Sequence, residues 1–354
     1  MATKEKQHAR FPRFDFEHVL ENIPRLDLSK VKDSHPLIEN FVMEGCTQVG
    51  YGKFGTRKTT IHLLAAFAVS QGVPFLGKKT QRRMVLYLDY ENPSGVLKQY
   101  CKDLAVNPDD PRFTIWDRAK EYPPLPGDER LDRFIQRCKK ATGHSPWIIF
   151  DSWTSLLRAG ESGDKIGEAT RIFRAIRKYC DQGATITIID HSGKRDGDGP
   201  IGTSAKMTQM DTAHKFSVQD DKISMDGRSS RSVIRVENFL KRFAPKNIGT
   251  FSIEITAAMD EKDEWHTVSV KPTKDKAVIK QEQEIEGMKH LIRHNPTAGQ
   301  EELARVAAKD KVVSGRDRAR QLLQEGIGKH WKAITNGKSH KQIFHVLKTA
   351  KQTN

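Results

Sequence analysis

The hydrophobic positions between residues 41 and 210 form short apolar runs that alternate with longer segments of helical periodicity. The apolar runs that predict strands lie at 47–50, 84–91, 146–151 and 184–190. The segments that predict helices lie at 59–71, 94–104, 129–142 and 167–181. Strands that are apolar on both faces and alternate with helices are typical of a parallel sheet covered on both sides. The pattern therefore predicts an α/β fold with a central, mostly parallel sheet.

A different pattern begins after residue 210, where apolar and polar residues alternate with a period of two. This alternation is typical of antiparallel strands that have one covered face. The alternating segments lie at 213–218, 222–225, 232–239, 250–255 and 265–270. We expect them to extend the parallel sheet as antiparallel strands.

The last quarter of the chain predicts a second unit. Its helical segments lie at 285–294, 300–308 and 316–325. Two short strands then flank Asn336-Gly337, a strong hairpin signal. Three short helices followed by a hairpin predict a winged helix. The expected boundaries of an N-terminal arm, the α/β domain, a polar linker and the winged helix are 1–40, 41–270, 271–284 and 285–354.

The formal net charge of +15 and the pI near 9.6 make polyanions, nucleic acid first, the expected partners. Residues 274–354 contain 17 Lys and Arg against nine Asp and Glu, a net charge of +8. No apolar run approaches the ~18 residues of a membrane span, and no apolar segment follows the basic N-terminus as in a signal peptide. Four scattered cysteines without a Cys-x-x-Cys pair indicate reduced thiols, and together these features favour the cytoplasm.

The stretch GKFGTRKTT is one position away from a phosphate-binding loop, Gly-x4-Gly-Lys-Ser/Thr. Gly52, Lys58 and Thr59 have the required spacing, whereas Arg57 stands where the second glycine belongs. Backbone N–H groups of such a loop cradle phosphate, the lysine reaches the terminal phosphates, and the hydroxyl ligates Mg²⁺. The residues expected to bind ATP are Gly52, Lys53, Phe54, Gly55, Thr56, Arg57, Lys58, Thr59 and Thr60.

Polar residues follow three of the predicted parallel strands, at the edge of the sheet where ligands bind. Asp151 fits the acid that holds Mg²⁺ together with Thr59. Glu91, at the end of the strand expected beside the loop strand, fits the carboxylate that polarises the attacking water, with Asp89 as an open alternative. His191 fits a sensor of the γ-phosphate.

Basic residues later in the chain supply two further sets of candidates. Lys241 and Arg242, at the end of a predicted strand, are alternatives for a positive charge delivered to the transition state, often from a neighbouring subunit. In the winged helix, a basic face would bind the major groove or its phosphates, or would instead contact a protein. The residues of this face and its wing are Arg316, Arg318, Arg320, Lys329, Lys338 and Lys341.

The motifs GKFGTRKTT, VLYLDYE, WIIFDS, TIIDHSGK and LKR, in this order, resemble those of RecA-like ATPases of the RepA/DnaB helicase type, especially the RepA-like replicative helicases of plasmids and phages. The resemblance covers residues 40–256. It implies a RecA-type core in a ring, commonly hexameric, with ATP between subunits and single-stranded DNA in the channel. It also implies Glu91 as catalytic base, Asp151 as Walker B acid, His191 as sensor and Lys241 or Arg242 as the trans-acting finger. The loop 193–210, with Lys194, Arg195 and Lys206, would touch this DNA.

Three functions are compatible with the sequence, and we favour an ATP-driven DNA motor, with duplex DNA as a further partner through the winged helix. A partition ATPase of the ParA/MinD type is indicated only by Lys53 and is opposed by Phe54, Arg57 and Glu91. A non-enzymatic DNA-binding regulator with a degenerate nucleotide site is indicated by Arg57, because a side chain there can hinder the approach of the backbone to phosphate.

Overall fold

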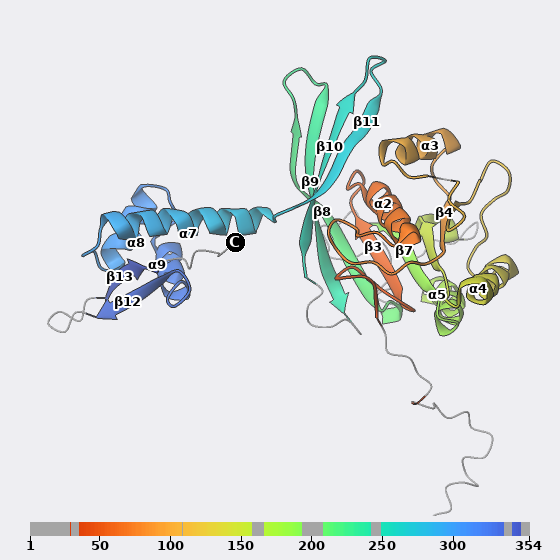
Figure 1. The fold of residues 1–354 in the computed structure, drawn as a ribbon, viewed down its shortest axis with the longest axis horizontal. Helices are drawn as coiled ribbons and strands as arrows, with labels where there is room; N and C mark the ends of the chain where they lie inside the picture. Colours follow the sequence, from red (N-terminus) through yellow and green to blue (C-terminus); the bar gives the residue numbers. More distant parts are fainter. Residues whose placement is uncertain are drawn as a thin grey trace, which may run out of the picture. The chain divides into compact units, whose positions relative to one another are not determined.

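The computed structural model describes residue 29 and residues 35–107, 109–157, 166–192, 208–241, 249–335 and 342–347. A nine-stranded sheet has the order β11-β10-β9-β8-β3-β7-β6-β4-β5 (Figure 1). Its parallel strands are β3 (Thr47–Gly52), β4 (Val85–Asp89), β5 (Phe113–Ile115), β6 (Trp147–Asp151) and β7 (Thr185–His191). The antiparallel part consists of β8 (Thr212–Ile223), β9 (Ser229–Lys241), β10 (Phe251–Met259) and β11 (Trp265–Thr273). The predicted α/β sheet with an antiparallel extension is confirmed.

β8 joins the two parts of the sheet, because it pairs parallel with β3 and antiparallel with β9. The expectation of two separate strands at 213–218 and 222–225 is wrong, since β8 includes the first segment and residues 222–223 of the second. The pairing register shifts between Val218 and Asp220, which is typical of a β-bulge. A bulge interrupts the alternation of apolar and polar residues without ending the strand, and the sequence pattern therefore divided one strand into two.

The strand that precedes Glu91 does not lie beside the loop strand, so that expectation is also wrong. β3 has β7 and β8 as its neighbours, and β6 lies between β7 and β4. Each crossover through a helix can pass over a strand, so order along the chain does not give order in the sheet. Gly52 pairs with His191, and Asp151 pairs with Asp89, at the same edge of the sheet.

Helices cover both faces of the parallel strands (Figure 1). On one face, α2 (Lys58–Gln71) and α3 (Ser94–Asp103) pack on the odd-numbered residues of β4 and β6, such as Tyr87 and Ile149. On the other face, α4 (Glu129–Thr142) and α5 (Ile166–Asp181) pack on even-numbered residues such as Leu88 and Ile148. α2 is buried along nearly its whole length, as its almost uniformly apolar sequence predicts.

The domain boundaries differ from those expected at both ends of the sheet domain. β1 (Pro36–Ile38) pairs with β2 (Val42–Met43) and buries Leu37 and Ile38 in the α2-side core, so the domain includes residues before 41. The linker expected at 271–284 is largely regular structure, since β11 continues to Thr273 and α7 (Lys276–His294) follows. Charged residues made this stretch resemble a linker, although charge is equally typical of an exposed helix face.

The remaining described residues form a unit with its own core. Its elements are α7, α8 (Gln300–Lys309), α9 (Arg316–Glu325), β12 (Trp331–Thr335) and β13 (Gln342–Val346). β12 and β13 are antiparallel, with Trp331 opposite Val346. Leu303 of α8, Leu322 of α9, Trp331 and Phe344 are buried together. Three helices followed by a two-stranded sheet match the elements that the sequence predicts.

Among the described residues, no helix is both long and apolar enough to cross a membrane.

Gly326→Ala tests the packing of this C-terminal unit. A Cβ at residue 326 would lie 2.2 Å from Cζ2 of the buried Trp331, whose Nε1 donates to the carbonyl oxygen of Leu323 at 2.7 Å. We expect the free energy of unfolding to fall by about 1–3 kcal/mol, because overpacking displaces the ring. Urea denaturation followed by tryptophan fluorescence would measure this loss. Gly315→Ala, where no atom lies within 4 Å of the added Cβ, is the control, and equal midpoints for the two variants would contradict the packing.

Candidate nucleotide site

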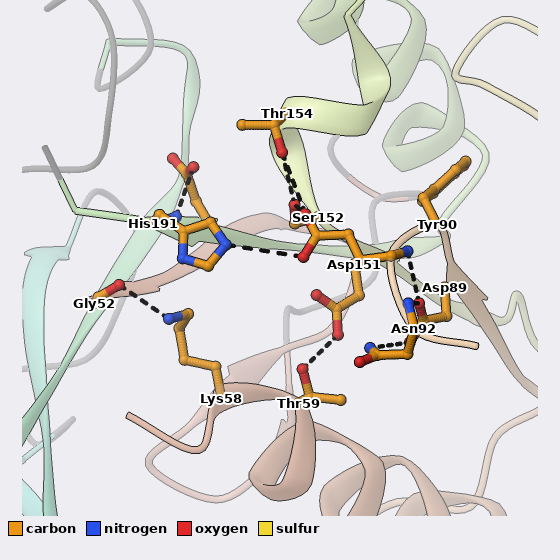
Figure 2. Close-up of polar contacts among 12 residues, drawn as sticks. Gly52, Lys58, Thr59, Asp89, Tyr90, Asn92, Asp151, Ser152, Thr154 and His191 are labelled. Atoms are coloured by element: carbon orange, nitrogen blue, oxygen red, sulfur yellow. Dashed lines mark hydrogen bonds and ion pairs between the residues drawn. The ribbon is translucent and has the colours of Figure 1, made fainter. Parts of the chain in front are cut away.

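The loop between β3 and α2 folds around the side chain of Lys58. Its ammonium donates to the carbonyl oxygens of Gly52 at 2.9 Å and Lys53 at 3.1 Å, and to Thr56 Oγ1 at 3.2 Å. Gly52 leaves no room for a side chain, because a Cβ there would lie 2.4 Å from the carbonyl oxygen of Phe216. Figure 2 shows Lys58 extending toward Gly52 from the start of α2. The lysine of the motif thus lies inside the loop, where it can reach a phosphate bound there.

The other residues of the loop differ in exposure and backbone conformation. Phe54 is 93% exposed at the tip of the loop, and Gly55 has a φ of 81°. Arg57 also lies in the left-handed region, with φ 56° and ψ 27°, which costs a residue other than glycine about 1–2 kcal/mol. Thr60 is buried in α2. Arg57 therefore adopts a backbone conformation that favours glycine.

Asp151, at the end of β6, is bonded to the start of α2. Its Oδ2 accepts hydrogen bonds from Thr59 Oγ1 at 2.8 Å and from the Tyr87 hydroxyl at 2.7 Å. Burial, followed by the nearby Asp89 carboxylate, raises the pKa of Asp151 from 3.8 to about 7. A buried carboxylate beside a hydroxyl offers two hard oxygen ligands, the kind that Mg²⁺ prefers. Thr59 and Asp151 therefore fit the expected magnesium site.

Glu91 lies in the same site and is surrounded by polar groups. Its Oε1 accepts hydrogen bonds from the Ser152 hydroxyl and from Thr154 Oγ1, the second at 3.2 Å. Its Oε2 lies 3.9 Å from His191 Nε2, an ion-pair distance that is too long for a hydrogen bond. The His191 imidazole, opposed by burial and assisted by the Ser152 hydroxyl, lowers the pKa of Glu91 to about 2. The Glu91 carboxylate is thus ionised at neutral pH and can only accept hydrogen bonds.

Asp89, the alternative to Glu91, is hydrogen-bonded to the turn that follows β4. Its Oδ1 accepts from the backbone N–H groups of Glu91 at 2.9 Å and Asn92 at 2.7 Å, and its Oδ2 accepts from Asn92 Nδ2 at 2.7 Å. These bonds fold the chain after β4 into the turn that carries Glu91. Asp89 is buried, whereas the Glu91 side chain is 40% exposed, which favours Glu91 as the residue that faces water.

His191 contacts both the loop strand and Glu91, since its backbone pairs with Gly52 and its Nε2 lies 3.9 Å from Glu91 Oε2. It ends β7, the strand beside β3, and its ring stacks on that of Phe54 with centroids 6.3 Å apart.

Burial lowers the pKa of Lys58 to about 8, while Asp151 and other carboxylates act in the opposite direction. Lys58 therefore retains its positive charge at neutral pH.

The sequence did not single out three side chains that contact this site. Tyr87 donates to Asp151, and Ser152 and Thr154 contact Glu91. One signal existed for Ser152 and Thr154, because hydroxyl residues directly follow the strand-end Asp151. No comparable signal existed for Tyr87, since an aromatic residue within an apolar strand is usually part of the core.

Several candidates cannot be placed. Lys241 is the last residue of β9, but its side chain is not described. The candidates outside the described residues are Lys194, Arg195, Lys206, Arg242, Lys338 and Lys341.

The candidate DNA-binding arginines of α9 are not equivalent. Arg318 pairs with Glu284 of α7 at 3.0 Å, and Arg320 pairs with Glu301 at 2.7 Å and with Asp317 at 2.6 Å. Arg316 and Lys329 are exposed and have no ion pair among the described residues. Two of the four basic residues on this face are thus engaged by acidic partners within the unit.

Asp151→Asn tests the buried carboxylate. Because the folded pKa of about 7 exceeds the ordinary 3.8, the folded protein binds the extra proton, and the free energy of unfolding falls as the pH rises from 4 to 7. We expect the wild type to lose roughly 1–3 kcal/mol more than Asp151→Asn between pH 5 and pH 8 in urea denaturation without Mg²⁺ or nucleotide. Asp181→Asn, at an exposed position, should follow the wild type. Parallel losses in the wild type and Asp151→Asn would rule out the buried charge.

Comparison with known proteins gives a matching family model and distant solved structures. No curated protein matches the chain. The crystal structure of the RadB recombinase matches with 16% identity and a TM-score of 0.39 over 65% of this chain and 92% of that one, a likeness too distant to carry an argument. The family model described as AAA domain matches residues 17–197, just over half of the 354 residues. With its phosphate-binding loop and strand-end acids, the chain belongs to the AAA domain family of P-loop ATPases.

Proposed function

We propose that this protein is an ATP-driven motor on DNA, a ring-forming helicase that moves along single-stranded DNA. One arrangement carries the proposal: the ends of β3, β6 and β4 bring Lys58, Asp151 and Glu91 to one edge of the sheet. Nucleotide hydrolysis needs a phosphate-binding cation, a metal-binding acid and a group that orients water.

The loop would bind the phosphates of ATP in this site. Lys58 would exchange its bonds to the carbonyl oxygens of Gly52 and Lys53 for phosphate oxygens. Thr59 and Asp151 would hold Mg²⁺, which supplies positive charge to the phosphates. A divalent cation bound there would favour the ionised carboxylate and so lower the pKa of Asp151.

Glu91 would orient the attacking water. A carboxylate with a pKa of about 2 is a weak base, so Glu91 would act chiefly by accepting a hydrogen bond from the water. Ser152 and Thr154 hold one of its oxygens, and the other faces His191. His191 would report the state of the site to the loop that follows β7.

The DNA part of the proposal rests on charge and on the order of the motifs. A net charge of +15 favours a polyanionic partner, and the motif order resembles that of RepA/DnaB-type helicases. In a hexameric ring, Lys194, Arg195 and Lys206 would contact single-stranded DNA. Lys241 or Arg242 would reach the nucleotide of a neighbouring subunit.

A DNA-binding regulator without catalysis is the second candidate. The observation that favours it is Arg57, which occupies the left-handed position of the second glycine in the loop. Such a protein would bind ATP without hydrolysing it under any DNA condition.

Lys58→Ala and Glu91→Gln test the motor. We expect each to lower the ATPase rate measured with single-stranded DNA by at least about 100-fold, because each removes a group that acts on the reacting phosphate or water. Lys140→Ala, an exposed residue of α4, should keep the wild-type rate. No DNA-stimulated hydrolysis by the wild type would exclude the motor and favour the regulator.

We further propose that residues 276–347 are a winged helix that binds duplex DNA through α9. The exposed Arg316 and Lys329 would contact phosphates, whereas Arg318 and Arg320 stabilise the unit through their acidic partners. The net charge of +8 in residues 274–354 supports this assignment.

Arg316→Ala combined with Lys329→Ala should weaken duplex binding by the full chain without lowering its stability. Each lost phosphate contact should reduce the slope of log affinity against log salt concentration by about one. Fluorescence anisotropy with a labelled duplex in the absence of nucleotide would measure both. Arg318→Ala should mainly lower stability, because it leaves the buried Glu284 unpaired. An unchanged salt slope in the double variant would indicate a protein-binding unit instead.

A further inference from the structure

The backbone of Arg57 marks the junction between the phosphate loop and α2. Its φ of 56° and ψ of 27° are left-handed, and its carbonyl oxygen accepts the first hydrogen bond of the helix, from the Ile61 N–H at 3.0 Å. Glycine adopts this conformation without strain, and glycine is the residue that phosphate-binding loops have here. An arginine at this position therefore has a backbone cost that nothing in the turn itself explains.

The Arg57 side chain is exposed and makes no hydrogen bond or ion pair among the described residues. It directly precedes Lys58 and Thr59, whose side chains contact the loop and Asp151. Its charge also acts on Tyr100 of α3, where burial raises the pKa of the hydroxyl, Arg57 lowers it, and Asp151 raises it. The exposed guanidinium, next in the chain to the ammonium of Lys58 and the hydroxyl of Thr59, is thus available to a phosphate bound at the loop.

The charges of the site leave a role for a second cation. Three carboxylates, those of Asp151, Asp190 and Glu91, act on one buried ammonium, that of Lys58. A bound triphosphate adds further negative charge, and its terminal phosphate carries the largest share. A guanidinium is suited to phosphate oxygens, because its planar donors match their geometry and it stays ionised at every relevant pH.

We propose that Arg57 is a nucleotide-binding residue whose guanidinium contacts the terminal phosphate of a nucleoside triphosphate bound in the same subunit. This inference rests on the proposed nucleotide site, but not on hydrolysis or on DNA. Arg57 makes the loop selective for the triphosphate over the diphosphate, and the charge it supplies offsets the strain of its backbone. The loop is then a modified phosphate-binding loop, in which a side chain adds to the contacts of the backbone.

Nucleotide affinity and thermal stability together test this role in three variants of the full chain. Arg57→Gly removes both the strain and the charge, Arg57→Gln keeps the strain and removes the charge, and Arg57→Lys keeps both. Calorimetric titration with Mg²⁺ and the non-hydrolysable analogue AMP-PNP, and with ADP, gives the affinities, and the Tm without nucleotide reports the strain. Arg133→Gln, at an exposed arginine of α4, controls for a general effect of charge.

We expect Arg57→Gly and Arg57→Gln to weaken AMP-PNP binding by about 10-fold or more and ADP binding by less than about 3-fold. Arg57→Lys should lie between these variants and the wild type. Arg57→Gly alone should raise the Tm by a few degrees, because glycine relieves the left-handed strain. In Arg57→Gly the Tm should therefore rise while the affinity for AMP-PNP falls. A side chain with no role in nucleotide binding would give the rise in Tm without the loss of affinity.

Two results would overturn the inference. AMP-PNP binding by Arg57→Gly that equals or exceeds that of the wild type would mean that the side chain only occupies the turn or obstructs it. Equal losses for AMP-PNP and ADP would mean that Arg57 does not contact the terminal phosphate. Wild-type binding without hydrolysis would overturn only the proposed motor, whereas absence of any nucleotide binding would overturn both.

Discussion

The hydrogen bond from Thr59 Oγ1 to Asp151 Oδ2 joins the phosphate loop, helix α2 and the central sheet at one point. It depends on strand order, because β6 must end beside the start of α2 for a side chain to span the gap. Tyr87 supplies a second donor from β4, and together these bonds hold a carboxylate that burial would otherwise exclude from the fold. The high pKa of Asp151 is the electrostatic cost of this arrangement, and perturbed groups of this kind are typical of functional sites.

Asp151 and Glu91 show how environment separates two carboxylates of one site. Burial raises the pKa of Asp151, although its two neutral donors oppose the shift. Glu91 is partly exposed beside an imidazole and two hydroxyls, so its pKa falls. The environment of Asp151 suits a carboxylate that ionises when a cation binds. The environment of Glu91 suits a carboxylate that stays ionised and accepts hydrogen bonds. Asp89 contributes to both, since its charge raises the pKa of Asp151 while its hydrogen bonds fix the turn before Glu91.

The C-terminal unit shows that a basic sequence is not the same as a basic surface. Arg318 and Arg320 look alike in the sequence as candidates for DNA binding, but both pair with acidic residues of the unit. Glu284 is buried, and the Arg318 guanidinium offsets the cost of its charge. Only contacts between helices reveal which cations are already engaged.

The sequence by itself determined the α/β class, the position of the phosphate loop and the polar residues that end three strands. These are local properties, since apolar runs, glycine spacing and strand ends can be recognised within a few residues. The tertiary structure alone decided that β7 and β6 separate β3 from β4, and that Ser152 contacts Glu91 across 61 residues of chain. That contact requires β4 and β6 to be paired with Asp89 opposite Asp151, a register set by the packing of both sheet faces. The backbone conformation of Arg57 is also a feature that only the structure decided. The sequence shows that the residue is unusual in such a loop, but only the structure shows that its backbone is left-handed.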